Sequence, residues 1–211
     1  MRTPSKTSSK MPIKFLANKN VIVFGSTGVG KTQFILEVIR QRLVHPFPEN
    51  VYYMYNVEQD FMTTWNETEV QPIKFIKGLQ FDEVDTSKPS MLIIDDLILA
   101  TDKNVAEMFI MGAHHKSVSV FYLTQNLFHN CDLFRLMSKN THYYVIFENQ
   151  RNFSQIATLA RQTALKTQIL ESYLRASKKP RGFIVLSFAP ELPRELSVVT
   201  DWWELCPSIY L

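Results

Sequence analysis

The stretch Gly25-Ser26-Thr27-Gly28-Val29-Gly30-Lys31-Thr32 satisfies the pattern G-x-x-x-x-G-K-[ST] in full. A short apolar run, Asn20-Val21-Ile22-Val23-Phe24, comes directly before it and predicts a buried strand. Apolar side chains then recur at helical spacing across residues 33–43. Strand, glycine loop and helix in this order are the context in which the pattern forms a phosphate-binding loop, or P-loop.

The residue types of this loop suit a polyphosphate. The loop must turn its backbone N–H groups inward, and Gly25, Gly28 and Gly30 carry no Cβ that would obstruct this curl. The first turn of the following helix adds unpaired N–H groups and a positive dipole end. Lys31 is long enough to reach the β- and γ-phosphates, and the Thr32 hydroxyl is a suitable Mg²⁺ ligand. The loop therefore predicts binding of a nucleoside triphosphate with Mg²⁺.

Composition indicates a single globular domain. The chain has 211 residues, 45% of them hydrophobic and 20% charged, which is long enough for a sizeable core. No apolar run approaches the roughly 18 residues of a membrane span, and the polar, basic start does not resemble a secretory signal. Cys131 and Cys206 are too few for a disulfide framework or a metal pair, so we expect a reducing compartment.

The formal net charge of +3 reflects the N-terminal segment. Residues 1–20 hold five basic side chains and no acid, and the remainder has 18 basic against 20 acidic residues. We expect residues 1–11 to form a disordered basic tail and residues 12–211 to form one domain. Electrostatic contact of the tail with nucleic acid is the alternative reading.

Strand-like and helix-like segments alternate along the chain. We expect strands at residues 20–24, 51–55, 73–76, 91–94, 118–123, 143–147 and 183–188. We expect helices at residues 33–43, 60–65, 103–114, 132–138, 153–162 and 165–177. This order predicts an α/β fold with a mostly parallel central sheet covered on both faces, and such sheets bind ligands at the carboxyl ends of their strands.

A second motif places two acids after an apolar strand. Met91-Leu92-Ile93-Ile94 is followed by Asp95 and Asp96, a Walker B pattern. Asp95 is the candidate Mg²⁺ ligand, and Asp96 is placed to orient and deprotonate an attacking water. A helix N-cap is the alternative role for Asp95.

A third apolar strand, residues 118–123, is followed directly by polar residues, and Gln125 is one of them. A glutamine at this point can hydrogen-bond the γ-phosphate or the attacking water and so distinguish ATP from ADP. A solvent-facing loop glutamine is the alternative. Gly25, Asp95 and Gln125 follow three strands of one predicted sheet, so we expect them to meet at one edge.

Four other sequence features point less specifically to a function. His114-His115 suits a surface pair better than a metal site, because adjacent histidines do not share a helix face. The tyrosines in residues 52–55 favour strand packing, and Trp202-Trp203 predicts docking of the C-terminal segment onto the body. Lys178-Lys179-Pro180-Arg181 reads as an exposed basic turn or as a DNA-contacting loop.

Five segments occur here in an order that resembles a known family: Gly25–Thr32, Ile93–Leu97, His114–Val120, Leu123–Phe128 and Gln155–Gln162. They resemble the genome-packaging ATPases of double-stranded DNA viruses, within the FtsK–HerA group. The likeness is greatest to the short packaging ATPases of adenovirus-like viruses and of Polinton (adintovirus) elements. It extends over roughly residues 18–190, and the stretch from His114 to Phe128 makes it specific.

The resemblance implies a three-layer RecA-like core in which the Walker B strand and the sensor strand lie beside the P-loop strand. It implies ATP hydrolysis, with Mg²⁺, coupled to pumping of double-stranded DNA into a capsid. It also implies a homo-oligomeric ring of five or six copies with ATP at the subunit interfaces. A capsid or portal (vertex) protein would be the partner, and the virion or the host nucleus or cytoplasm the location.

By position, the resemblance assigns the phosphate loop to Gly25–Thr32, the Walker B pair to Asp95 and Asp96, and the sensor to Gln125. Family members usually have Glu as the second acid, and Asp96 is one methylene shorter. The attacking water would then lie closer to the strand, or another acid such as Glu107 would contribute.

Ring ATPases of this kind use an arginine from the neighbouring subunit, because a permanently charged guanidinium suits the charge that develops on the transferring phosphoryl group. Arg135 and Arg151 are the candidates, and a surface salt bridge is the alternative role of each.

Two other classes compete with this reading. In a small P-loop nucleoside or nucleotide kinase, Arg151, Arg161 and Arg175 would form a lid over the phosphates. The third class is a structural protein that binds ATP without hydrolysing it, against which the intact Lys31 and the two acids argue. An Asn-Lys-x-Asp motif for reading guanine is missing from the sequence, which disfavours a GTPase.

Overall fold

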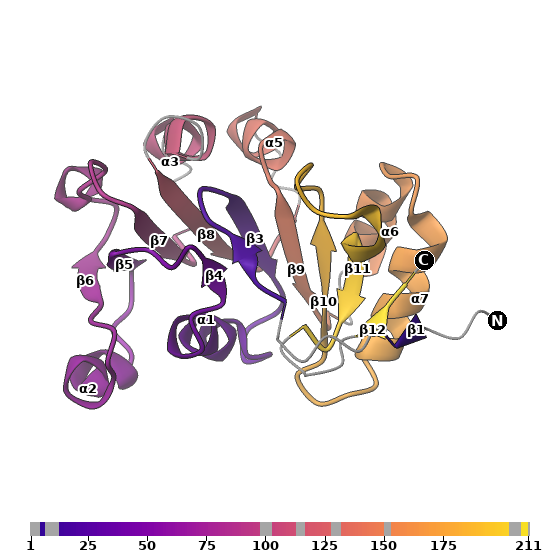
Figure 1. The fold of residues 1–211 in the computed structure, drawn as a ribbon, viewed down its shortest axis with the longest axis horizontal. Coiled ribbons are helices and arrows are strands. Elements are labelled where there is room, and N and C mark those ends of the chain that lie inside the picture. The colour runs from indigo at the N-terminus through magenta and orange to yellow at the C-terminus, as the bar shows by residue number, and fades with distance from the viewer. Residues whose placement is uncertain are drawn as a thin grey trace.

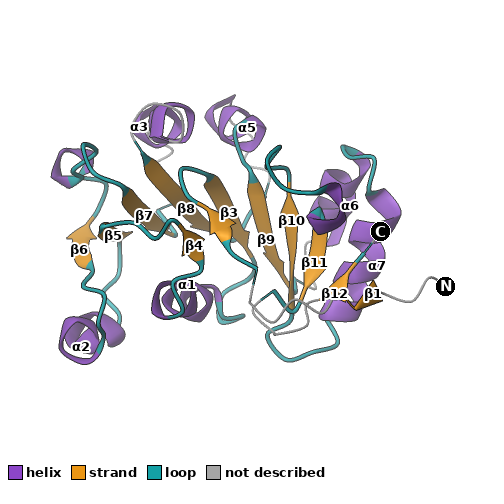
Figure 2. Ribbon diagram, in the orientation of Figure 1, coloured by secondary structure: helices purple, strands orange, loops and turns teal. Residues whose placement is uncertain are grey.

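The computed structural model describes residues 5–6, 13–97, 103–112, 117–127, 132–149, 153–202 and 208–210. These residues form three layers, with a twisted sheet between helices on its two faces (Figures 1 and 2). The alternation of strands and helices in the sequence thus produced the expected α/β architecture with a large, mostly parallel sheet.

The main sheet has ten strands in the order β1-β12-β11-β10-β9-β3-β8-β7-β5-β6 (Figure 1). Six strands run parallel: β3 (Asn20–Phe24), β5 (Asn50–Tyr55), β6 (Lys74–Lys77), β7 (Ser90–Asp95), β8 (Val118–Thr124) and β9 (Tyr143–Phe147). The others pair antiparallel: β10 (Phe183–Ser187), β11 (Val198–Thr200), β12 (Ser208–Ile209) and β1 (Ser5–Lys6). A separate parallel pair joins β2 (Phe15–Leu16) to β4 (Val44–His45).

Helices cover both faces of this sheet (Figure 1). One face carries α1 (Lys31–Arg40) and α2 (Phe61–Thr68). The other carries α3 (Lys103–Glu107), α5 (Asp132–Lys139), α6 (Phe153–Arg161) and α7 (Lys166–Ala176). The helix predicted over residues 103–114 is α-helical only to Glu107 and continues as a π-helix over Met108–Gly112. Among the described helices, none has the length and apolarity needed to cross a bilayer.

Two apolar cores lie on the two sides of the sheet, because successive residues of a strand point to opposite faces. In β3, Ile22 and Phe24 join the core under α3 and α5, while Val21 and Val23 join the core under α1. All five residues of β3 are buried. A strand covered on both faces has a nearly continuous run of apolar residues, and this run is what predicts the central strands from the sequence.

The order of the central strands differs from one expectation. The Walker B strand and the sensor strand were both expected beside the P-loop strand β3. The sensor strand β8 does pair with β3, but the Walker B strand β7 pairs with β8 and β5 instead. The other neighbour of β3 is β9. The expectation for the Walker B strand was therefore wrong, because β8 is inserted between the two.

The C-terminal segment packs onto the body, as expected from its tryptophans. The Trp202 side chain is fully buried and stacks on Phe15 of β2, with ring centroids 4.9 Å apart; Trp203 lies outside the described residues. Within the predicted tail, Ser5–Lys6 pairs with Ser208–Ile209. The predicted disorder of the remaining tail residues and the single domain over 12–211 stay predictions.

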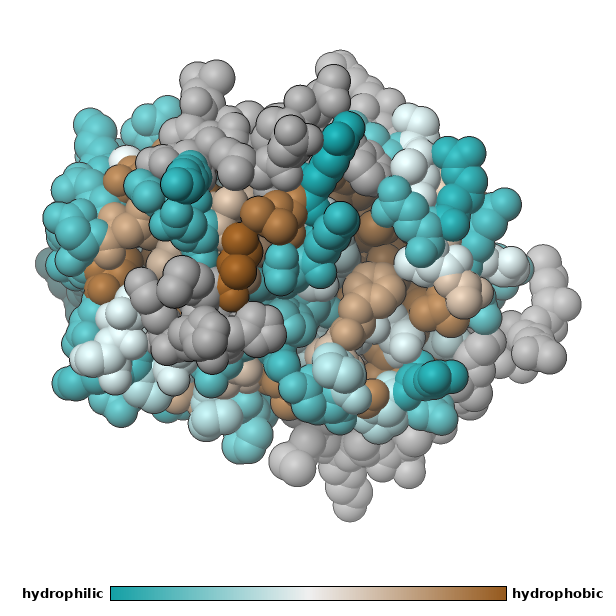
Figure 3. Space-filling view, turned by 90° about the horizontal axis from the view of Figure 1, so that it is seen from above, coloured by the Kyte–Doolittle hydropathy of each residue, from teal (hydrophilic) through white to brown (hydrophobic). Residues whose placement is uncertain are grey.

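The face that carries α3 and α5 is seen from above in Figure 3. Hydrophobic surface occupies its central part, among hydrophilic side chains. Large apolar side chains that are exposed in the described part of the chain include Leu136 of α5, Phe153 of α6 and Phe188 after β10.

Candidate nucleotide-binding site

The loop between β3 and α1 has the curled backbone expected of a P-loop. Gly28 and Gly30 have φ angles of 80° and 108°, in the left-handed region that side chains with a Cβ rarely adopt. Gly30 is the N-cap of α1, and the helix begins at Lys31. Gly25 is required for another reason, since a Cβ there would lie 2.8 Å from both Phe147 Cβ and Val29 Cγ2. The loop therefore places the N-terminus of α1 at the carboxyl end of β3, where an anion can reach its N–H groups.

Lys31 is nearly buried, with 8% of its surface exposed. Its ammonium donates to the carbonyl oxygens of Gly25, at 2.8 Å, and Ser26, at 3.0 Å. Burial lowers the pKa of Lys31, whereas the carboxylates of Asp96 and Asp95 act in the opposite direction. A phosphate that reaches Lys31 would supply the negative charge that these two neutral carbonyls lack.

Asp95 is held at the end of β7 by two hydrogen bonds. The Tyr53 hydroxyl donates to its Oδ2 at 2.6 Å, and Gln59 Nε2 donates to the same oxygen at 3.1 Å. The Tyr53 hydroxyl also hydrogen-bonds Thr32, which brings the two predicted metal ligands to one tyrosine. Burial raises the pKa of Asp95, and the bonds from Tyr53 and Gln59 oppose that rise. Burial and the charge of Asp95 raise the pKa of Tyr53, so this hydroxyl remains a donor.

A chain of side-chain hydrogen bonds connects the P-loop to the second acid. Thr27 Oγ1 donates to Gln125 Oε1 at 3.0 Å, and Gln125 Nε2 donates to Asp96 Oδ2 at 2.6 Å. The backbone is coupled as well, because the Gly25 N–H donates to the carbonyl of Thr124 at 3.2 Å. Asp96 has a φ of 51°, a strained conformation that aspartate tolerates better than most residues. Gln125 thus spans the space between the phosphate loop and the predicted base.

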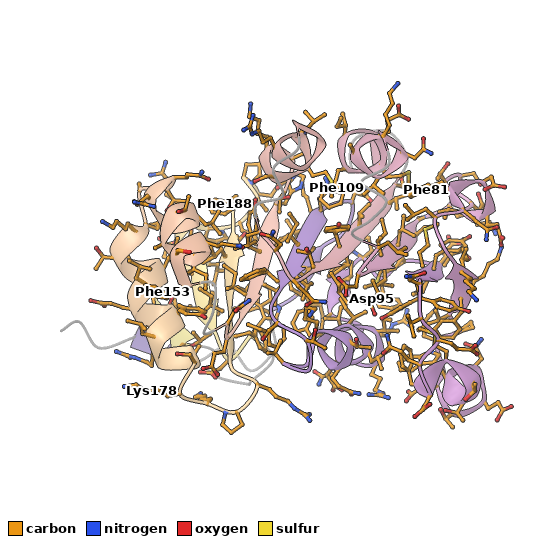
Figure 4. The ribbon with its side chains drawn as sticks, turned by 180° about the vertical axis from the view of Figure 1, so that it is seen from behind. Phe81, Asp95, Phe109, Phe153, Lys178 and Phe188 are labelled. Carbon is orange, nitrogen blue, oxygen red and sulfur yellow. The ribbon has the colours of Figure 1, made fainter. Side chains whose placement is uncertain are left out.

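These residues surround one cavity of about 480 Å³. It is lined by the P-loop residues Thr27, Gly28, Gly30, Lys31 and Thr32, by Gln33, by Tyr55, Asn56, Val57 and Gln59, by Asp95 and Asp96, and by Gln125 and Arg181. Figure 4 shows Asp95 in the central part of the molecule. The three motifs therefore converge on one edge of the sheet, as their positions after parallel strands predicted.

Other candidates lie elsewhere. Glu107 is exposed on α3 and pairs with Lys103 at 3.9 Å, so it is not at the cavity. Arg135 is exposed on α5 and does not line the cavity of its own chain. Arg151 and His114-His115 lie outside the described residues. In the described part of the chain, no cluster of three or more His, Cys, Asp or Glu side chains is arranged to hold a metal ion.

The arginine lid expected for a kinase is not formed by the two described arginines. Arg161 donates to Thr158 Oγ1 within α6, and the Arg175 guanidinium lies 5.5 Å from the ring centroid of Tyr210. Neither lines the cavity.

Sequence reasoning missed three residues of the site. Tyr53 was interpreted as strand packing, and it is fully buried in β5, but its hydroxyl reaches Asp95. Gln59 lies in the loop after β5 and had no signal. Arg181 belongs to the predicted basic turn, which is exposed as expected, and it also lines the cavity. A signal for Tyr53 existed, because it lies near the carboxyl end of a strand expected in the same parallel sheet as Asp95.

No protein-family model matches this chain, and no curated protein matches it. Solved structures do share its fold. The DNA-packaging ATPase B204 of Sulfolobus turreted icosahedral virus matches 92% of this chain and 98% of its own, with a TM-score of 0.58 and 11% identity. The genome-packaging NTPase B204 of Sulfolobus turreted icosahedral virus 2, in complex with ATPγS, matches 92% and 97%, with a TM-score of 0.52 and 12% identity. The fold is that of a RecA-like P-loop NTPase.

The candidate nucleotide-binding site has suitable ligands for Mg²⁺. Mg²⁺ prefers oxygen ligands and is usually held by one or two protein side chains together with waters and substrate phosphates. The Thr32 hydroxyl and the Asp95 carboxylate are oxygen donors that meet at Tyr53. Among the described residues, both hydrogen bonds to Asp95 go to Oδ2, which leaves Oδ1 for a cation.

Replacing Gln125 by alanine removes the bridge between Thr27 and Asp96. We expect the kcat for ATP hydrolysis to fall about 10²-fold, the scale of losing one preorganised donor at a reacting centre. Nucleotide affinity should change less than about twofold, because the P-loop and Lys31 remain. Steady-state kinetics together with equilibrium titration of ATPγS separate these two quantities.

Gln41→Ala is the matched control, since Gln41 lies at the far end of α1 and bonds to Glu37 on the surface. It should behave as the wild type. If Gln125→Ala weakened ATPγS binding as much as it lowered kcat, Gln125 would be a binding residue and not a sensor.

Proposed function

We propose that this chain is an ATPase that moves double-stranded DNA and packages a viral genome into a capsid. The observation that carries the ATPase part is the convergence of Lys31, the Asp95-Asp96 pair and Gln125 on one cavity beside the P-loop. A protein that only binds ATP needs the phosphate loop. The second acid and the glutamine hydrogen-bonded to it add what activation of a water molecule requires, which supports hydrolysis over binding alone.

In the proposed reaction, the triphosphate lies along the P-loop with Lys31 at the β- and γ-phosphates. Thr32 and Asp95 would hold Mg²⁺, which neutralises charge on the phosphate oxygens when bound. Asp96 accepts the proton of a water molecule whose oxygen attacks the γ-phosphorus. The bond from this phosphorus to the bridging oxygen breaks, and ADP and phosphate are formed. Gln125, which donates to Asp96 Oδ2, would also hydrogen-bond this water and so keep it next to Asp96.

Two findings support DNA packaging as the task. The sequence segments resemble those of viral packaging ATPases of the FtsK–HerA group, adenovirus-like and Polinton type. The fold is shared with the B204 structures over more than nine-tenths of both chains. We therefore propose a homo-oligomeric ring of five or six copies that threads duplex DNA, engages a capsid or portal protein, and acts in the virion or in the infected cell.

In such a ring, a neighbour would contribute the arginine that completes the site. Arg135 and Arg151 remain the candidates for this trans role. Arg135 is exposed on α5 and does not line its own chain's cavity, as a residue acting on a neighbour's nucleotide requires.

ATP turnover measured with added DNA or nucleosides tests the proposal. We expect linear duplex DNA to stimulate hydrolysis several-fold, because a translocating motor couples turnover to its track. Thymidine and other nucleosides should have no effect. Asp95→Asn, which removes the charge that holds Mg²⁺, should reduce the rate to background with and without DNA.

Stimulation by a nucleoside but not by DNA would overturn the motor and favour a nucleoside or nucleotide kinase. Turnover of Asp95→Asn at the wild-type rate would show that the assigned site is not the site of hydrolysis.

A further inference from the structure

The basic turn between α7 and β10 contains three cations in three different surroundings. Lys179 forms an ion pair with Asp201. Figure 4 shows Lys178 at the periphery of the molecule, away from Asp95. Arg181 lines the cavity beside the P-loop. The turn is therefore not a uniformly solvated basic tip, because its last cation faces the candidate nucleotide site.

The stem of Arg181 packs against the P-loop glycine that begins α1. A Cβ built on Gly30 would lie 3.6 Å from Arg181 Cδ, 3.8 Å from Cγ and 3.9 Å from Cβ. Three consecutive carbons of the side chain thus lie along Gly30, the N-cap of α1. Lys31 and Arg181 are the two cations among the residues that line the cavity.

The turn that presents Arg181 is tightly built. Lys179 N–H donates to Ala176 O at 2.9 Å, and Gly182 N–H donates to Lys179 O at 3.0 Å. A Cβ at Gly182 would lie 1.9 Å from Ala176 O, so only glycine fits there. Arg181 itself has a φ of 55°, a strained conformation for a residue with a Cβ. Strain of this kind persists where surrounding structure enforces it, often at ligand sites.

An anionic ligand explains this arrangement better than a surface role. Among the described residues, Arg181 has no acidic partner within ion-pair distance, unlike Lys179. The N-terminus of α1, against which it packs, is where phosphate groups bind in this type of loop. A guanidinium is planar, always charged and able to bind two phosphate oxygens at once.

We propose that Arg181 binds the phosphates of the nucleotide held by Gly25–Thr32 of the same chain. This inference rests on the proposed nucleotide site, but not on DNA translocation. The nucleotide would then be held from two sides, by the P-loop and by the turn that leads into β10. Arg181 differs from Arg135 and Arg151, which are proposed to act from a neighbouring subunit.

Equilibrium titration tests the proposal directly. Fluorescent ATP and ADP analogues would be titrated at protein concentrations where size-exclusion chromatography with light scattering shows monomers, with unlabelled adenosine as a competitor. We expect Arg181→Ala to weaken binding of both nucleotides about tenfold, which corresponds to about 1.4 kcal/mol. Arg181→Lys should recover part of the loss, because lysine keeps the positive charge but cannot bind two phosphate oxygens at once as a guanidinium does. Adenosine affinity should not change.

Lys178→Ala is the matched control, a cation of the same turn that does not line the cavity, and it should bind as the wild type. Lys31→Ala reports on the site as a whole. If the wild type bound no nucleotide, the proposed function would fail and this proposal with it. If the wild type bound, Lys31→Ala did not, and Arg181→Ala matched the wild type, only the role of Arg181 would be overturned.

Three further results would also reject the phosphate contact in cis. An equal loss of adenosine affinity would place the guanidinium on the base. A loss seen only at concentrations where rings form would make Arg181 a residue acting between subunits. Weaker binding of duplex DNA with unchanged nucleotide affinity would make the turn a DNA-contacting loop.

Discussion

Lys31→Ala is expected to lower kcat/KM for ATP hydrolysis by about 10²–10³-fold, the scale reported for removing one electrostatic contact to the reacting group. The ammonium is nearly buried and held by the carbonyls of Gly25 and Ser26, so it is already aimed into the loop. Alanine leaves no cation at the β- and γ-phosphates. A coupled assay of ADP release, with and without duplex DNA, measures the effect.

Folding of the Lys31 variant needs a separate check, because the substitution also removes two hydrogen bonds inside the P-loop. Thermal unfolding followed by circular dichroism gives this. Lys178→Ala serves as the control for loss of a positive charge and should keep wild-type turnover. Wild-type activity of a folded Lys31→Ala protein would mean that Gly25–Thr32 does not hold the reacting phosphates.

Trp202→Ala is expected to lower the free energy of unfolding by about 3–5 kcal/mol, the usual cost of deleting a buried indole. The ring is fully buried and stacks on Phe15, which in turn contacts Phe34 of α1 and Phe121 of β8 edge-to-face. Its loss would leave a cavity next to Phe15 and Tyr143, the two rings that it contacts. Urea unfolding monitored by circular dichroism gives the free energy and its denaturant slope.

Two further variants serve as controls for the loss of stability expected of Trp202→Ala. Trp202→Phe should cost clearly less, since the indole N–H is buried without a hydrogen-bond partner in the described structure and no polar contact is lost. Val70→Ala, at a side chain that is 98% exposed, should change the free energy by less than about 0.5 kcal/mol. A Trp202→Ala protein as stable as Val70→Ala would show that the C-terminal segment does not contribute to the core.

The position of the site was predictable because it depends on rules that act locally. Each of Gly25, Asp95 and Gln125 follows an apolar strand, and parallel strands place their carboxyl ends at one edge. The loop curl followed from the glycines, and the buried central strands followed from continuous apolar runs. These inferences needed no knowledge of which strand lies beside which.

The remaining features depend on contacts between distant segments. The bond from Tyr53 to Asp95 requires β5 to lie beside β7, and strand order cannot be read from apolar runs. Arg181 reaches the P-loop only because β10 joins the sheet next to β9 and the turn before it folds back over Gly30. The short strands β11 and β12 have too few residues to show a period of two.

The insertion of β8 between β3 and β7 separates the strand that leads into the P-loop from the strand that ends in the two acids. Neighbouring strands lie about 4.8 Å apart, so the P-loop strand and the acid strand are separated by about 10 Å at the sheet edge. Gln125, which follows the intervening strand β8, therefore lies between the two motifs and bridges that separation through its hydrogen bonds with Thr27 and Asp96.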